Sequence, residues 1–133
     1  MNQVDAALYA ILSDNAELGE KVTGVYNAVA PETAEYPFVI FNEQSGTDSY
    51  VFGDYSHRNL VYLVKCVAKS PSAKVAGEVY DIIESILMDR QLTMDGYKNI
   101  YLRRESDVKY PEVVDGIQYW HVGALYSITV VPE

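Results

Sequence analysis

Cysteine, basic side chains and long apolar runs are all scarce in this sequence of 133 residues. Cys66 is the only cysteine, so no intrachain disulfide forms, and no Cys or His spacing suits zinc. No run approaches the ~20 apolar residues that cross a bilayer, and residues 1–12 lack the basic start and continuous apolar segment of a signal peptide. The sequence therefore predicts a soluble protein of intracellular type, with no membrane partner, no metal and no cofactor.

Basic residues number 10 against 19 acidic ones, which gives a net charge of −9. Phosphate backbones are bound by clustered Lys and Arg, so this balance predicts no specific nucleic-acid binding. The composition, with 49% hydrophobic and 22% charged residues, is that of a globular protein. The length fits one domain, and we expect residues 1–133 to form it.

Patterns for catalysis are missing as well. Cys66 falls on the apolar face of a predicted strand and is expected to be a small buried hydrophobic side chain. His57 and His121 have no carboxylate or ligand partner at a meaningful spacing, so each is predicted at the surface or in an interface. Gly46 and Gly53 belong to no phosphate-binding motif. Two carboxylates brought together by the fold remain an open alternative, but the sequence predicts that the protein is not an enzyme.

Tyrosine is the abundant aromatic residue, with 12 copies against 3 phenylalanines and 1 tryptophan. A tyrosine side chain offers apolar area together with a hydroxyl, which suits surfaces that are buried only on assembly. The composition therefore favours an interaction protein.

Apolar periodicity predicts three helices. The first begins at Asn2 as N-cap and ends near Ser13, and a short second one follows Asp14. The third spans about 71–88, with Ser70 as N-cap and Pro71 at its first position. Its apolar stripe predicts that Ile82 and Ile86 are buried against a sheet. Strands are predicted at 25–29, 36–41, 58–68, 99–104 and 117–131.

This order predicts an α+β fold, with a mostly antiparallel sheet, one long helix (about 71–88) packed on a face, and short N-terminal helices. Residues 58–68 are apolar on both faces of their strand, so they require cover on both faces, and another subunit is one source of it. The segment 104–116 is predicted to be a charged loop.

A second long connection, residues 44–57 (QSGTDSYVFGDYSH), is predicted between two strands. It carries Tyr50, Val51, Phe52 and Tyr55 among Gly, Asp and Ser. One interpretation is an Ω-loop or an extended hairpin folded onto its own domain; the other is a protruding arm that meets a partner.

Three segments, in this order, are similar to a known family: VYNAVAPETAEYPFVIF (25–41), RNLVYLVKCVAKSPSAKVAGEVYDII (58–83) and DGIQYWHVGALYSITV (115–130). With the N-terminal helix they cover nearly the whole chain. In this order the sequence resembles the tail completion, or tail terminator, proteins of long-tailed bacteriophages with non-contractile tails.

The resemblance implies a structural role. Proteins of this kind form a ring, typically a hexamer, that caps the last ring of the major tail tube protein and ends tube growth. The ring presents a joining surface to the head-side connector protein, and DNA passes through its lumen. The implied location is the head-proximal end of the virion tail, after assembly in the host cytoplasm. Tyr50, Phe52 and Tyr55 are then expected at an intersubunit or tube-facing surface.

Other interpretations stay open. Within virion assembly, the alternative is another neck-region or head–tail connector protein. In a different class, the alternative is a small monomeric ligand-binding or hydrolytic domain. The molar mass in solution separates a ring from a monomer.

Overall fold

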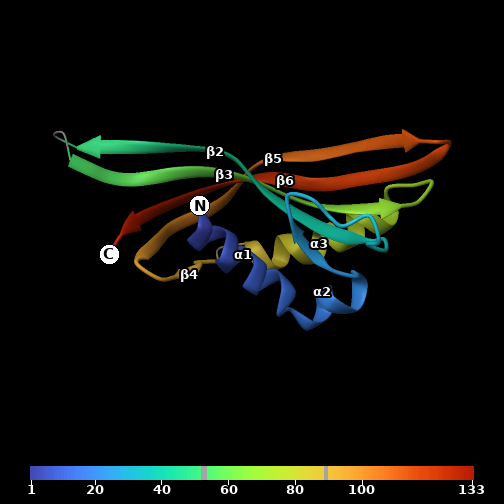
Figure 1. Cartoon of the computed structure of the whole chain (residues 1–133), viewed down its shortest axis with the longest axis horizontal. Helices are drawn as coiled ribbons and strands as arrows, with labels where there is room; N and C mark the ends of the chain where they lie inside the picture. Colours follow the sequence, from blue (N-terminus) through green and yellow to red (C-terminus); the bar gives the residue numbers. More distant parts are fainter. Residues whose placement is uncertain (52–53, 89) are drawn as a thin grey trace.

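The computed structural model describes residues 1–51, 54–88 and 90–133 (Figure 1). Three helices and six strands lie in this part of the chain. The helices are α1 (Asn2–Ser13), α2 (Ala16–Lys21) and α3 (Lys74–Leu87). The strands are β1 (Val25–Asn27), β2 (Phe38–Val51), β3 (Asp54–Lys69), β4 (Thr93–Met94), β5 (Tyr97–Val114) and β6 (Ile117–Pro132).

The predicted α+β fold class, with a long helix over about 71–88 packed on a face, is wrong. Strands take up 52% of the chain, in one curled six-stranded sheet, and the helices are three short ones. The sheet order is β1-β2-β3-β6-β5-β4, with β1 parallel to β2 and the other pairs antiparallel. The protein is therefore mostly β.

The two segments predicted as long connections account for most of this error. Residues 44–51 and 54–57 continue β2 and β3, and residues 104–114 continue β5. Their Ser, Thr, Asp, Glu and Lys side chains are typical of loops, but pairing with a long partner strand overrides that preference. Asp115 and Gly116 then close β5 onto β6 with φ values of 52° and 78°, as in the favoured two-residue hairpin turns.

Two hairpin arms result from these continuations. The β2–β3 arm comprises residues 44–51 and 54–59, and the β5–β6 arm comprises residues 104–119. Figure 1 shows their turns at opposite ends of the molecule, with the helices gathered beneath the middle of the sheet. The arms therefore lengthen the sheet well past the part that the helices support.

The third helix also begins later than predicted. Ser70 and Ser72 accept hydrogen bonds from the backbone N–H groups two residues on, which forms turns there instead of helix. The cap of α2 is likewise Asn15 rather than Asp14, because the Asn15 side chain accepts the Leu18 N–H at 2.9 Å. The first helix ends at Ser13 as predicted, but its N-cap is Met1 rather than Asn2, and Asn2 is its first residue.

The core lies between the helices and one face of the sheet. Alternate β3 residues point into it, from Leu60 to Ala68, and Cys66 among them is fully buried, as predicted. Burial raises the pKa of the Cys66 thiol to about 12. Ile86 is buried, with 4% of its surface exposed, whereas Ile82 is only partly buried at the margin of the core. The prediction is therefore confirmed for Ile86 alone.

Candidate interaction surfaces

The side of the sheet away from the helices has no cover from them (Figure 1). We call it the uncovered face. On β3 the residues that alternate with the core set, Val61, Leu63 and Lys65, are partly buried there. This arrangement agrees with the sequence pattern, which is apolar on both sides of the strand. Partly exposed aliphatic side chains at the centre of a sheet are typical of a surface that another protein covers.

Aromatic rings gather at one part of the uncovered face. The Tyr36 ring lies 4.9 Å from that of Phe38 and 5.1 Å from that of Tyr119, measured between centroids. His121 stacks on Tyr110 at 4.5 Å with only 7° between the ring planes. We call these five side chains the aromatic row. It reaches from the start of β2 across to β5.

The strand register explains why these residues meet. Phe38 pairs with Val67, Val67 with His121, and His121 with Tyr110. Directly opposed residues share a face of the sheet, so one line of pairs crosses four strands. Phe38, Val67 and His121 are all buried, yet they lie outside the main core cluster. They form a second, small buried layer on the uncovered face.

His121 was predicted at the surface or in an interface, but only 8% of it is exposed because Tyr110 covers it. Its Nε2 lies 3.3 Å from Glu112 Oε1, and its Nδ1 is buried without a partner among the described residues. Lys65 Nζ donates to the Tyr110 hydroxyl at 3.0 Å. Burial, and then the Lys65 charge, lower the His121 pKa, against the opposing effect of Glu112.

Sequence reasoning missed Tyr110 and Lys65 as members of this surface. Tyr110 fell in the segment predicted as a loop, so no face was assigned to it. Lys65 lies in the segment 58–68, which was treated as apolar on both faces of its strand. The available signal was the alternation Tyr110, Glu112, Val114, which places all three on one side of a strand.

Two of the three predicted interface residues, Tyr50 and Tyr55, lie on the β2–β3 arm. Tyr50 is 62% exposed and pairs across the ladder with Tyr55. Tyr55 belongs to β3 by its backbone, its side chain is not among the described ones, and Phe52 lies outside the described residues. His57 pairs with Ser49 on the same arm, and its Nδ1 is 3.1 Å from Ser56 Oγ. The assignment of the three aromatic residues to an interface stays a prediction.

The β5–β6 arm ends in exposed apolar side chains. Val113, Val114 and Ile117 are 67%, 47% and 38% exposed. At the base of the arm, Arg104 forms an ion pair of 2.7 Å with Glu84 of α3. An ion pair thus links the base of the arm to α3, while the tip of the arm is apolar.

Neither a metal centre nor a membrane span is found in the described part of the chain. No group of three or more His, Cys, Asp or Glu side chains there is placed to hold a metal ion. No helix within residues 1–51, 54–88 and 90–133 is long and apolar enough to cross a membrane.

The protein is mostly β, with one face of its sheet covered by helices and two projecting arms. Large parts of the sheet surface therefore have no helix packed on them. The family model for the tail completion protein gp17 matches residues 6–117, and the chain belongs to that family. It is therefore a structural protein of the phage tail, located in the virion. The resemblance noted in the sequence is confirmed.

Solved structures share the fold. One is a chain from the virion of a native gene transfer agent particle, with a TM-score of 0.82 and 15% identity over 98% of this chain and 96% of that one. A second solved structure has a TM-score of 0.62 and 14% identity over 99% and 97% of the two chains. Among curated proteins, none matches the sequence.

Proposed function

We propose that this protein, as a single tail-terminator-like domain, caps the tail tube as a ring. The ring contains several copies of this chain, typically six, and rests on the major tail tube protein at the head-proximal end of the tail. It ends tube growth and offers the joining surface for the head-side connector protein. Assembly takes place in the host cytoplasm, and no step requires catalysis, a cofactor or a membrane.

The uncovered face of the sheet is the observation that carries this proposal. Apolar area left in water costs roughly 25 cal/mol per Å2, so a face bearing Val61, Leu63 and the aromatic row gains stability when another protein covers it. Tyrosine and other aromatic residues are enriched at such contacts. The similarity in fold to a chain of a gene transfer agent virion adds support.

The two arms fit the same role. A ring needs contacts in which one surface of a copy meets a different surface of the next, and arms at opposite ends of an elongated sheet provide such surfaces (Figure 1). We place Tyr50, Phe52 and Tyr55 at an intersubunit or tube-facing contact.

The charge of the chain suits a channel. DNA passes through the ring lumen when it is ejected, and a wall that held phosphates tightly would hinder it. The net charge of −9 argues against such retention, because phosphate binding needs clustered cations.

Tube growth in vitro tests the proposal. Purified tail tube subunits are polymerised with and without this protein, and tube ends and lengths are recorded in negative-stain images. We expect a ring on one end of each tube and no further extension from that end. Tubes that keep growing from both ends, with no added density, would contradict the proposed function.

A further inference from the structure

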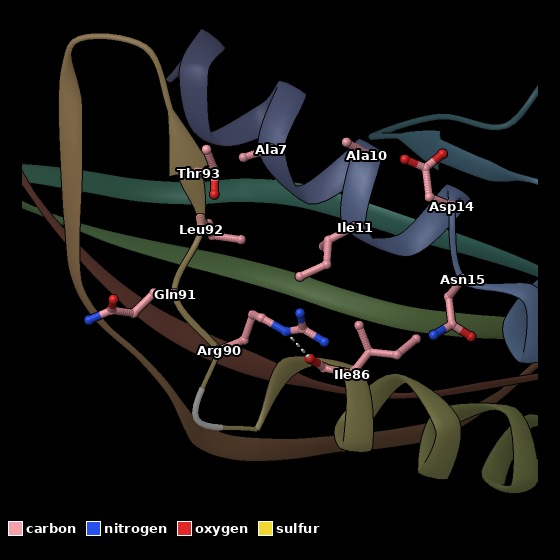
Figure 2. Close-up of a pocket in the computed structure, with 10 residues that line it drawn as sticks. All are labelled: Ala7, Ala10, Ile11, Asp14, Asn15, Ile86, Arg90, Gln91, Leu92 and Thr93. Atoms are coloured by element: carbon pink, nitrogen blue, oxygen red, sulfur yellow. Dashed lines mark hydrogen bonds between the residues drawn. The ribbon is translucent and has the colours of Figure 1, made fainter.

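A groove runs along α1. One part is a cleft of about 380 Å3 between α1, the end of α3 and the segment leading to β4 (Figure 2). A neighbouring hollow of about 470 Å3 shares Ala7, Ala10 and Thr93 with it, so the two lie side by side along α1. We call the whole the α1 groove. Its lining residues used below are Ala7, Ala10, Ile11, Asp14, Ile86 and Arg90.

The wall of the cleft has an apolar part, formed by Ala7, Ala10, Ile11, Ile86 and Leu92, and a polar part, formed by Asp14, Asn15, Arg90, Gln91 and Thr93. Ala7 and Ala10 of α1 leave the space that larger residues would fill, and Ile11 and Ile86 face each other across the cleft in Figure 2. This shape suits the insertion of short aliphatic side chains from outside.

One cation lies in the groove. Arg90 Nε donates to the Ile86 carbonyl at 3.2 Å, which holds the guanidinium beside the apolar wall (Figure 2). Arg90 forms no ion pair with any carboxylate in the described ranges. Asp14, the carboxylate that also lines the cleft, lies on its α1 side, away from the arginine in Figure 2. The Arg90 end of the groove therefore favours the binding of an anionic group that is flanked by apolar side chains.

The tip of the β5–β6 arm has that composition. Val114 and Ile117 are directly paired, so both point to the same side of the hairpin. Asp115 stands between them at the turn, followed by Gly116. A carboxylate at the extreme end, flanked by two partly exposed aliphatic side chains, matches the cation and the apolar wall of the α1 groove.

We propose that the tip of the β5–β6 arm of one copy inserts into the α1 groove of the next copy. Val114 and Ile117 contact Ala7, Ala10 and Ile86, and Asp115 pairs with Arg90. The occupant is a second copy because the tip and the groove lie far apart in one molecule (Figure 1). Such a head-to-tail contact closes into a ring when the rotation between copies permits. This inference rests on the proposed ring and names the contact that builds it.

Cross-linking of mixed variants tests the contact. In a Cys66→Ala background, copies with Ala10→Cys are mixed with copies carrying Val114→Cys, in the presence of tail tubes. A short flexible bis-maleimide then links thiols that lie close together. We expect adducts that join the two variants. Val29→Cys, a valine 77% exposed and on neither surface, replaces Val114→Cys as the matched control and should give none.

A charge exchange makes the test specific for the pair. Arg90→Glu alone, or Asp115→Lys alone, should lower the adduct yield about tenfold, because like charges then face each other. The two changes together should restore most of the yield, since the pair is re-formed with its signs reversed. Failure of the double variant to recover, while both singles are impaired, would overturn the Asp115–Arg90 pairing.

The outcomes separate this contact from the ring itself. Rings on the tubes without mixed adducts would overturn the inference and leave the proposed function standing. Adducts within one variant, Ala10→Cys to Ala10→Cys for example, would overturn it in favour of a two-fold contact. Tubes without any ring would overturn the proposed function, and this contact with it.

Discussion

Gly123 lies where β6 passes so close to β3 that no side chain fits between them. A Cβ added there would stand 2.1 Å from the Val64 carbonyl oxygen and 2.5 Å from Lys65 Cα. Both are backbone atoms, which cannot turn aside as the end of a long side chain does.

Replacing Gly123 with Ala should destabilise the fold by about 3 kcal/mol or more, the upper range for overpacking a close contact. Gly77→Ala is the matched control, because nothing lies within 4 Å of its added methyl group in α3. That change should stabilise the protein by about 0.5–1 kcal/mol. Urea unfolding measures both. Equal midpoints for Gly123→Ala and the parent protein would contradict the close approach.

His121 should make stability depend on pH. Burial and the Lys65 charge lower its pKa in the folded state, below the ordinary 6.5 that applies on unfolding. Above pH 6.5 the ring is neutral in both states and has no effect. As the pH falls through 6.5 the unfolded chain binds the proton first, so the folded state loses stability until the lowered folded pKa is passed.

Denaturation at a series of pH values checks this sign. His121→Gln should lose less stability than the parent protein as the pH falls below 6.5. Lys65→Met should raise the His121 pKa, which an NMR titration of the imidazole resonances would record. A pKa unchanged by Lys65→Met would refute the contribution assigned to the Lys65 charge.

At the scale of elements, the hairpin arms are what sequence reasoning missed. The middle strands were found because apolar residues alternate clearly, as from Leu60 to Ala68 and from Trp120 to Val130. The arms lie beyond that core and carry polar side chains on exposed strands, so alternation is weak and their composition is that of loops. Their strand character comes from pairing with a partner distant in sequence, which a local pattern does not contain.

Like the strands, the candidate surfaces could be predicted only in part from the sequence. The need for cover on both sides of β3 followed from its apolar alternation, and the structure places Val61 and Leu63 on the uncovered face. The aromatic row depends on strand register, and the α1 groove depends on the packing of α1 beside β4. Both are features of the tertiary structure, which a local sequence pattern does not contain. The family was recognised from the order of segments rather than from any site.

Within α3, the buried stripe predicts a large cost for truncation. Ile86→Ala should destabilise the protein by about 2–5 kcal/mol, because it leaves a cavity between α3 and α1. Ile100→Ala removes the same atoms from a side chain that is 46% exposed, and should change stability by about 0.5 kcal/mol or less. Equal effects of the two changes on the unfolding free energy would contradict the packing of α3.

The β2–β3 arm offers a separate test of assembly. Tyr50, Phe52 and Tyr55 changed together to Ser should leave the circular dichroism and the cooperative melting intact, but ring formation and tube capping should fail. Tyr9→Ser is the control, because Tyr9 is 52% exposed on α1 and belongs to neither arm. A triple variant that caps tubes normally would show that these aromatic residues serve only their own hairpin.

At the scale of the whole molecule, the fold has two layers, a sheet and the helices on one of its faces, and no layer on the other face. Helices cover one face of the sheet, and the other face exposes aliphatic and aromatic side chains between two long arms (Figure 1). The chain belongs to a family of structural phage-tail proteins, and the proposed ring would bury this apolar surface against neighbouring copies.

The molar mass of the purified protein, with negative-stain images of the same sample, tests this account most directly. We expect one discrete oligomer, either in solution or once tail tubes are added, with a mass that is a whole multiple of 14.9 kDa and six times that value for a hexamer. The images should show closed rings. A mass of 14.9 kDa in both conditions, with no ring at any tube end, would contradict the central claim.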